Sequence, residues 1–422
     1  MRLSARGPLD VVQYLLAIAM LLLAAAPVCG QSVIENPTDP PTRDRIELRE
    51  SWRVGADDED VLLGQVGVVA ADRQGRLYAL DSQLAQLQVF DPQGVHLETL
   101  SREGDGPGEV RQPIDVCLPG DGTVAILQPF PAKVTYLDLV SGNPVGSFQL
   151  GSSDPMSGGM GFMRAMAERG GTLLVAAMGM SFDLAEETIS EQRYLAIVDR
   201  QGNELRRVNE VSLDRKMTAY TVDEVAEYLP HRRSHFAVGP DGRIYTATSC
   251  EHYEITVQDS EGNVERIIRR DHDPRPRTDE ELAERRDSGT MNFGGQEPRV
   301  SHKLLDTNHP IAGLVVLENG SLWVLNSHSD DRWDDDGIMV YDVYDALGKL
   351  QREVEVVVPE GGQNNRLTLL DSGRFMMIKG LDSLSVSVSV SSGGDDDEPN
   401  QDLDGTTTTE ELLELVYFEP TE

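Results

Sequence analysis

One short pattern recurs six times along the chain: a turn that contains glycine, followed by a stretch in which apolar and polar residues alternate. The copies are DRQGRLYAL (72–80), PGDGTVAIL (119–127), ERGGTLLVA (168–176), GPDGRIYTA (239–247), LENGSLWVL (317–325) and LDSGRFMMI (370–378). Alternation with a period of two predicts half-buried β-strands, and glycine permits the positive φ that a tight turn between strands requires. The chain is therefore expected to fold as a series of similar β-hairpins.

A second glycine-containing turn follows most of these copies. The second turns are VFDPQG (89–94), YLDLVSG (136–142), IVDRQG (197–202), VQDSEG (257–262) and YDALG (344–348). Two hairpin turns per repeat, with one more strand before and after, predict a four-stranded antiparallel meander. Gly75 and Gly122 lie 47 residues apart, and Gly122 and Gly171 lie 49 apart, which is the spacing of propeller blades. We predict an all-β fold: a six-bladed β-propeller of four-stranded antiparallel blades with short helical insertions.

The two ends of such a ring have to meet, because open sheet edges invite aggregation. Residues 45–54 (RIELRESWRV) alternate ahead of the first full repeat. We expect them to supply the missing strand of the last blade, beside 412–418 (LLELVYF). Between blades, capping boxes at 221–224 (TVDE) and 278–281 (TDEE) predict two short surface helices.

The stretch REGDGPGEVRQPIDV (102–116) leads into the second repeat. A phosphate-binding loop would need a Lys-Ser/Thr ending and a following helix, whereas Pro113 and a strand follow here. With DRQGRLYALDSQLAQLQVFDPQG (72–94), this stretch resembles the NHL repeat and the related six-bladed propellers of exported bacterial proteins. The matching positions are Gly104, Gly106, Gly108, Pro113, Asp121 and Gly122 in one half, and Asp81, Val89, Phe90, Asp91 and Gly94 in the other.

The resemblance is strong over 61–150, present at 236–270 and faint elsewhere. One departure is Gln86, which stands where the family pattern commonly has arginine. The resemblance implies a propeller fold. It says little about function, because propellers serve in binding, scaffolding and catalysis alike.

The first 30 residues are expected to be a signal peptide. Arg2 and Arg6 precede an apolar run from Val11 to Val28 that ends in small residues, as in secretory leaders. The chain is therefore expected to be exported, to the periplasm or outside the cell. A lipid anchor at Cys29 is not expected, because Val28 is not the small residue that precedes a lipidated cysteine.

The remaining chain is expected to form one domain. Residues 31–44 are polar and rich in proline and are predicted to be a linker. Residues 45–422 would form the propeller, with a polar, acidic insertion at about 391–411. No segment beyond the leader has the ~18 consecutive apolar residues of a membrane span, so no span is expected after signal cleavage.

The net charge of −35 argues against a nucleic-acid ligand, since binding phosphates requires a basic surface. Only Cys117 and Cys250 would remain after cleavage, so no disulfide framework is implied, and whether these two pair is left open. The Gly-x-Ser-x-Gly motif of serine hydrolases does not occur.

The segment HRRSHF (231–236) is the first candidate site, because it precedes the inner strand of the fourth blade. Residues at the starts of inner strands line the central channel of a propeller. His231, Arg232, Arg233 and His235 are therefore predicted to face a ligand at the channel mouth. Arginine suits a carboxylate or phosphate, and the alternative is a solvated loop paired with nearby carboxylates.

Histidines raise a second possibility, a metal site. NHL-type lyases and propeller lactonases place metal ligands from several blades around the channel mouth. His252, His302, His309 and His328 fall near blades four and five. No closely spaced motif such as His-Glu-x-x-His is present, so ordinary surface or core histidines are favoured.

A third candidate is a calcium loop in NQDLDGTTTTEE (400–411). Asn400, Asp402, Asp404 and Glu411 occupy positions 1, 3, 5 and 12 of such a loop, with glycine at position 6. Against calcium, an apolar residue is missing at position 8 and the preceding segment is a strand rather than a helix. A disordered acidic loop is the favoured alternative.

Taken together, these features favour a non-catalytic exported propeller that acts as a binding or scaffold module. Its partner would be a protein or a small anionic ligand at the channel mouth. Calcium is the one cofactor that the sequence suggests. The alternative function is a metal-dependent propeller enzyme, a lyase or lactonase, with its site at the central channel.

Overall fold

The computed structural model of the 422-residue chain describes residues 32–55, 61–151, 160–287, 298–329, 337–358, 365–380 and 413–421. This part of the chain is nearly all strand. Its helical elements are α2 (Asp279–Asp287) and the 3-10 turn η2 (Arg233–His235). None of its helices is long and apolar enough to cross a membrane.

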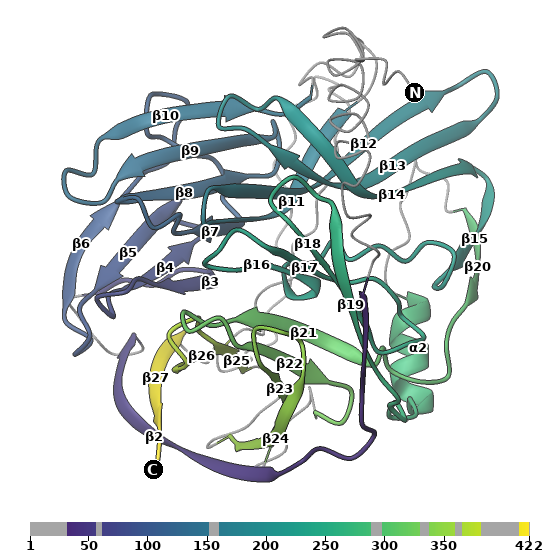
Figure 1. Cartoon of the computed structure of the whole chain (residues 1–422). Coiled ribbons are helices and arrows are strands. Elements are labelled where there is room, and N and C mark those ends of the chain that lie inside the picture. The colour runs from purple at the N-terminus through teal and green to yellow at the C-terminus, as the bar shows by residue number, and fades with distance from the viewer. Residues whose placement is uncertain are drawn as a thin grey trace, which may run out of the picture.

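The strands form six blades that follow one another in chain order, with blades five and six joined through β2 into one eight-stranded sheet (Figure 1). Blade one consists of β3 (Val66–Ala71), β4 (Leu77–Asp81), β5 (Gln86–Phe90) and β6 (His96–Leu100), and blade two of β7 (Asp115–Cys117), β8 (Thr123–Gln128), β9 (Lys133–Asp138) and β10 (Pro144–Gln149). Blade three consists of β11 (Met160–Arg169), β12 (Thr172–Asp183), β13 (Thr188–Val198) and β14 (Glu204–Lys216), and blade four of β16 (Phe236–Val238), β17 (Ile244–Ala247), β18 (Glu254–Gln258) and β19 (Val264–Arg270).

Blade five consists of β21 (Ile311–Val316), β22 (Leu322–Asn326), β23 (Ile338–Tyr344) and β24 (Leu350–Val357), and blade six of β25 (Arg366–Leu369), β26 (Phe375–Lys379), β27 (Glu414–Pro420) and the second half of β2 (Arg43–Gly55). Within each blade, neighbouring strands are antiparallel. The fold is the six-bladed β-propeller predicted from the repeats.

The ring is closed by pairing between the two ends of the chain. β2 runs antiparallel to β27, with Leu48 opposite Pro420 and Gly55 opposite Glu414, and Figure 1 shows the purple and yellow strands side by side. The Trp52 ring stacks on Tyr417 with 5.2 Å between ring centroids. The predicted pairing of 45–54 with 412–418 is confirmed.

The N-terminal strands also cover the outer edges of two further blades. β1 (Ser32–Asn36) pairs in parallel with β19 of blade four, and Arg43–Glu47 of β2 pair in parallel with β24 of blade five. The predicted linker 31–44 therefore contains β1 and the start of β2. The polar, proline-rich sequence did not predict these strands, because pairing at a sheet edge uses backbone groups and needs few apolar side chains.

Each turn depends on an acceptor side chain as well as on glycine. In blade one, Asp72 Oδ1 accepts hydrogen bonds from the backbone N–H groups of Gln74 and Arg76, both at 2.9 Å. Gly75, with φ of 81°, closes this turn. The same carboxylate-capped turn recurs between the third and fourth strands of several blades, at Asp91, Asp199, Asp259 and Asp345.

Apolar side chains fill the spaces between neighbouring blades. Tyr78 and Leu80 of blade one, for example, belong to the same buried cluster as Val124 and Ile126 of blade two. Because each sheet buries one face against the previous blade and the other against the next, its central strands read as continuous apolar runs. This packing fixes the positions of the six inner strands around the axis.

The two predicted capping boxes have different outcomes. Thr278 caps α2, because its hydroxyl accepts from Glu281 N–H at 3.2 Å and Glu281 Oε2 accepts from Thr278 N–H at 2.7 Å. The helix predicted to follow the box at 221–224, over 225–229, is wrong: residues up to Asp223 form β15 (Ala219–Asp223), paired in parallel with β20 (Arg299–Lys303), and a turn follows. The glutamate of that box, Glu224, binds other side chains instead of capping a helix.

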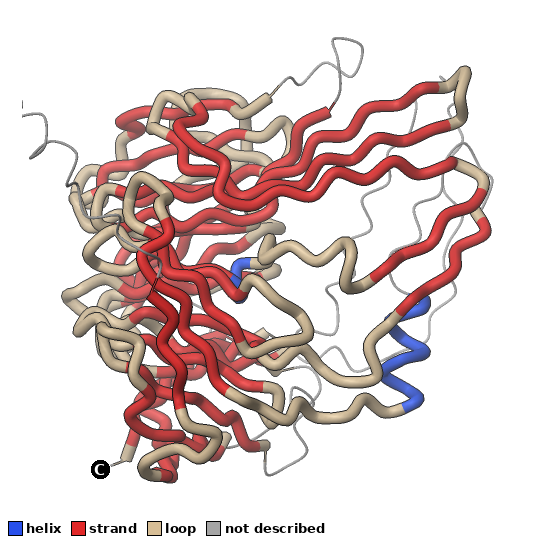
Figure 2. The backbone as a smooth tube through the Cα atoms, turned by 45° about the vertical axis from the view of Figure 1, so that its right-hand side comes forward, coloured by secondary structure: helices blue, strands red, loops and turns tan. Residues whose placement is uncertain are grey.

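One face of the disc carries most of the additional structure. The strands of blade three extend beyond those of the other blades, and β15, β20 and α2 lie on the same side (Figure 2). The inner strands also begin on this side, which we call the entrance face. The predicted acidic insertion 391–411 and signal peptide 1–30 lie outside the described residues.

Candidate functional site

A cavity of about 750 Å³ lies at the centre of the propeller. All six inner strands contribute to its wall: β3, β7, β11, β16, β21 and β25. Small-molecule sites in proteins usually enclose about 300–1,000 Å³ and are mostly apolar with a few placed polar groups. The central cavity is therefore the first candidate for a binding site.

The middle of the cavity wall is apolar. Each blade contributes small or branched aliphatic side chains, among them Val68, Leu118, Ala167, Ala237, Ala312 and Leu367. The inner strands are made of such residues because their side chains also pack against the neighbouring blades. The charged side chains of the wall lie at its two ends.

The entrance end is cationic. Arg233, Ser234, Asn365 and Arg366 line the cavity where the inner strands begin. Arg366 donates a hydrogen bond to the carbonyl oxygen of Gly67 on blade one. The Arg366 side chain is exposed at this end of the cavity, partial desolvation by the surrounding wall lowers its pKa, and no carboxylate lies within ion-pair distance of it among the described residues.

Arg233 is held at the entrance by a buried carboxylate. Its Nε lies 3.8 Å from Asp115 Oδ2, and its side chain is 47% exposed. Asp115 also accepts hydrogen bonds from the backbone N–H groups of Val116 and Met166, at 2.9 and 2.8 Å. Burial raises the pKa of Asp115, and Arg233 opposes that rise. Most of the five N–H donors of the Arg233 guanidinium remain available.

Two further arginines add positive charge near this end. Arg164 of β11 donates to Met178 Sδ at 3.6 Å, and its pKa is lowered by burial and by the charges of Arg193 and Arg232. These charges therefore lie close enough to repel one another. Within the part of the chain that the structure describes, neither Arg164 nor Arg232 pairs with a carboxylate.

The two histidines of the predicted site are packed into the protein. His231 Nδ1 lies 2.8 Å from the carbonyl oxygen of Leu229, and burial lowers the pKa of His231 to about 4. His235 is buried against the rings of Tyr228 and His309, and burial lowers the pKa of His235 to about 3. Both imidazoles are neutral at pH 7.

The structure thus separates the predicted ligand residues into two groups. Arg233 lines the cavity and Arg232 precedes it on the entrance face, whereas His231 and His235 belong to the supporting interior. Ligand binding by these residues stays a prediction. Sequence reasoning missed Arg366, which enters the site from another blade, although it stands at the start of an inner strand just as Arg233 does.

The far end of the cavity is crossed by an ion-pair network. Arg169 of blade three donates to the carbonyl oxygen of Val316 on blade five at 2.8 Å. It also pairs with Glu318 at 2.5 Å and with Asp371, in the β25–β26 turn of blade six, at 3.5 Å. Arg169 therefore joins three blades at this end, where its charge is balanced by carboxylates.

The histidines considered as metal ligands lie in separate surroundings. His309 Nε2 contacts Glu224 Oε1 at 2.7 Å, while His328 packs against His272 with 4.9 Å between ring centroids. Among the described residues, no three His, Cys, Asp or Glu side chains are grouped as a metal site would require. The predicted calcium ligands, Asn400, Asp402, Asp404 and Glu411, lie outside those residues.

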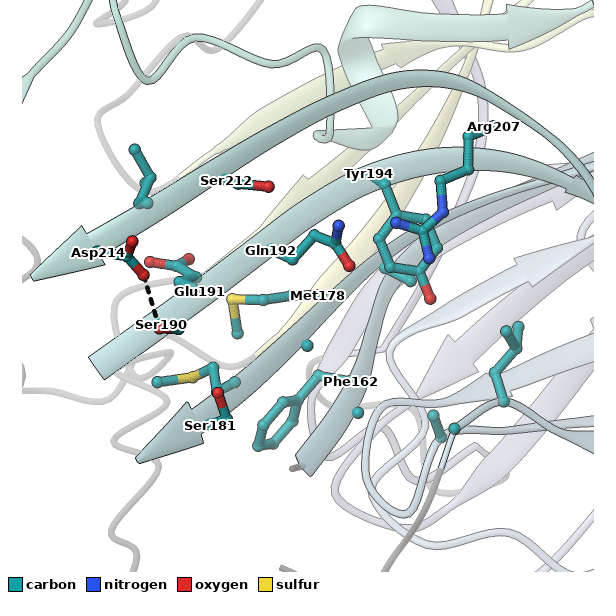
Figure 3. A pocket seen from close by; sticks show the side chains of 18 residues that line it. Phe162, Met178, Ser181, Ser190, Glu191, Gln192, Tyr194, Arg207, Ser212 and Asp214 are labelled. Atoms are coloured by element: carbon teal, nitrogen blue, oxygen red, sulfur yellow. Dashed lines mark hydrogen bonds between the residues drawn. The ribbon is translucent and has the colours of Figure 1, made fainter. Parts of the chain in front are cut away.

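A second hollow of about 410 Å³ lies along the extension of blade three (Figure 3). Within it, Ser190 Oγ donates to Asp214 Oδ1 at 2.6 Å. The Arg207 guanidinium covers the Tyr194 ring at 4.0 Å from its centroid, so one aromatic face is already occupied. The central cavity, to which all six blades contribute and whose entrance carries two arginines, is the stronger candidate.

Comparison with protein families supports the architecture. Residues 57–216 match the family model DUF5128, which is described as a 6-bladed beta-propeller. The matched family is one of propellers. The match names this architecture and not the NHL repeat, which stays a prediction. Comparison with curated proteins finds no significant match.

Several solved structures resemble the chain at low sequence identity. One is a Bacteroides fragilis NCTC 9343 protein assigned as exported, with 12% identity over 93% of this chain and 100% of that chain and a TM-score of 0.44. Another is a DUF4221 family member from Bacteroides vulgatus ATCC 8482, with 8% identity over 89% and 98% and a TM-score of 0.46.

A third similar structure is the calcium-binding protein regucalcin from Agrobacterium tumefaciens C58. It has 12% identity over 82% of this chain and 90% of that chain, with a TM-score of 0.40. Likenesses of this size carry no argument about activity or ligands.

Proposed function

We propose that this protein is an exported, non-catalytic β-propeller that binds a small anionic molecule at the entrance end of its central cavity. The observation that carries the proposal is the pair Arg233 and Arg366, which line the entrance end of the same cavity from different blades, beside a wall whose middle section is apolar. Export rests on the leader predicted over residues 1–30.

The charge distribution supports an anionic ligand. The chain has a net charge of −35, so carboxylates are abundant, yet among the described residues none pairs with Arg366, whose side chain is exposed at the cavity entrance. A bound carboxylate or phosphate would supply the missing counter-charge and would accept paired hydrogen bonds from the planar guanidinium.

The chemistry of the entrance supports binding rather than catalysis. Arginine side chains hold their protons at physiological pH and do not serve as general acids or bases. Asp115 is engaged with two backbone N–H groups and with Arg233. His231 and His235 are packed away from the cavity. The alternative of a metal-dependent enzyme stays a prediction from the sequence.

Isothermal titration of the purified protein with acetate, succinate, citrate and inorganic phosphate tests the proposal. At least one anion is expected to bind, more weakly at higher ionic strength. The double variant Arg233→Met/Arg366→Met should lower its affinity by roughly 10- to 150-fold, because hydrogen bonds to charged groups contribute ~1.5–3 kcal/mol.

Arg45→Met is the matched control. Arg45 is also an arginine on a strand, but it is 57% exposed and pairs with Glu355 on the outer edge of blade five. Its replacement should leave anion binding unchanged. The proposal is refuted if none of the anions binds, or if the double variant binds them as tightly as the native protein.

A further inference from the structure

We infer that the ligand of the central cavity is an amphiphile: an aliphatic carboxylate whose head group meets Arg233 and Arg366 and whose apolar chain runs along the axis. The inference rests on the proposed function and adds the chemical class of the ligand. It follows from where the charged and apolar side chains lie along the cavity and from the length of its apolar section.

The cavity wall changes character along its length. Charged side chains of the wall are confined to the entrance, with Arg233 and Arg366, and to the far end, with Glu168, Arg169 and Asp371. Between them the wall is built mainly of valine, alanine and leucine from all six blades. A small hydrophilic anion would leave this middle section unused.

The two charged ends also differ in their availability. At the far end Arg169 is satisfied by Glu318, Asp371 and the carbonyl oxygen of Val316. At the entrance, among the described residues, Arg233 pairs with Asp115 and Arg366 donates to a backbone carbonyl. A single anionic group is therefore expected to bind at the entrance, and the rest of the ligand to extend inward.

The length of the apolar section sets the size of the chain. From Gly67 to Ala71 the inner strand of blade one lines the cavity, and four steps of ~3.3 Å give a length of ~13 Å. With carbon–carbon bonds of about 1.5 Å, an extended alkyl chain advances ~1.3 Å per bond, so this length corresponds to roughly ten methylene groups. Moving such a chain from water to an apolar wall is favourable in proportion to the area buried.

Glycine at position 67 offers a way to block this path. A Cβ at Gly67 would meet no atom within 4 Å, so a leucine there would project into open space beside Arg366. Gly146, on the outer strand of blade two, is the matched control because a Cβ there also meets nothing within 4 Å. Neither glycine has a positive φ that would strain the substitution.

The test is titration of the native protein with acetate, hexanoate, octanoate and decanoate below their micellar concentrations, and with 1-decanol as the uncharged counterpart. Affinity should rise by about fourfold for each added methylene and level off near ten carbons. Gly67→Leu should weaken decanoate binding at least tenfold and Gly146→Leu should not, with thermal melts confirming that both fold.

The outcomes separate the two proposals. Binding of carboxylates with an affinity that does not depend on chain length would overturn the amphiphile and leave the anion site intact. Binding of 1-decanol as tightly as decanoate would overturn the role of the arginines, and with it the proposed function. No binding by any member of the series or by the other anions would overturn both.

Discussion

A buried ion pair between blades four and five gives a sharp test of what holds the ring together. Asp342 of β23 is fully buried and pairs with Arg270 of β19. It also accepts hydrogen bonds from Tyr253 Oη at 2.8 Å and Asn326 Nδ2 at 3.3 Å. Arg270 donates to the carbonyl oxygen of Thr38 at 2.8 Å, so it connects the N-terminal segment to both blades.

Replacing Arg270 by methionine should destabilise the protein by about 3–5 kcal/mol, because it leaves the Asp342 carboxylate buried without its counter-charge. Unfolding entropy is ~2.1 cal/mol/K per residue. For 422 residues this amounts to about 0.9 kcal/mol/K, so the midpoint of thermal unfolding should fall by roughly 3–6 °C. Arg45→Met, which breaks an exposed pair, should cost no more than about 1 kcal/mol.

The pH dependence gives an independent check. Burial already raises the pKa of Asp342 in the folded protein, against the opposing effect of Arg270. Without Arg270 that pKa should rise further. A carboxyl with a raised folded pKa loses stability as pH increases through that value, so the deficit of Arg270→Met should be largest at neutral pH and shrink in acid. Urea titrations at several pH values measure it, and a deficit below 1 kcal/mol or independent of pH would refute the reasoning.

Two further predictions concern the ring closure and the entrance face. Trp52→Ala removes the ring that stacks on Tyr417 and whose indole N–H donates to the carbonyl oxygen of Pro92 at 3.1 Å. Urea unfolding should show a loss of stability of about 3–5 kcal/mol. A loss below 1 kcal/mol would contradict a role of Trp52 in closing the ring. Hydrogen bonds from His309 and Arg277 lower the pKa of Glu224 despite its burial, so its contribution is present above pH 4.5 and lost as pH falls further. Glu224→Gln should therefore be less stable than the native protein at pH 7 but should show a smaller loss on acidification, and equal acid sensitivity of the two proteins would count against this.

The repeated turns explain why the fold could be predicted from the sequence. A glycine turn is a local signal, since its positive φ and the aspartate cap involve residues within four positions of one another. The closing strand was also predictable, because 45–54 and 412–418 are alternating stretches left over at the two ends. The helix expected after the box at 221–224 failed for a non-local reason: parallel pairing of residues 219–223 with β20 competes with a local cap.

The site was predictable only in part. Arg233 could be placed at the cavity because its distance from an inner strand is visible in the sequence. The sequence could not show that Arg366 lies at the same cavity as Arg233, because only the closed ring brings blades four and six around one axis. His231 and His235 stand in the same short segment as Arg233, yet their side chains turn into the interior, and spacing along the chain does not give that direction.

The closure of the ring has a consequence for when this chain can finish folding. Arg53 and Glu414 form an ion pair across 361 positions of sequence, and β1 and β2 pair with blades four to six, which leave the ribosome long after them. Contacts of such high contact order form slowly, because the chain between them has to be ordered first. The N-terminal strands therefore wait, unpaired, until the last blade is available. For a chain predicted to cross a membrane behind its leader, this delay would keep the ring open during transport and place its closure after arrival.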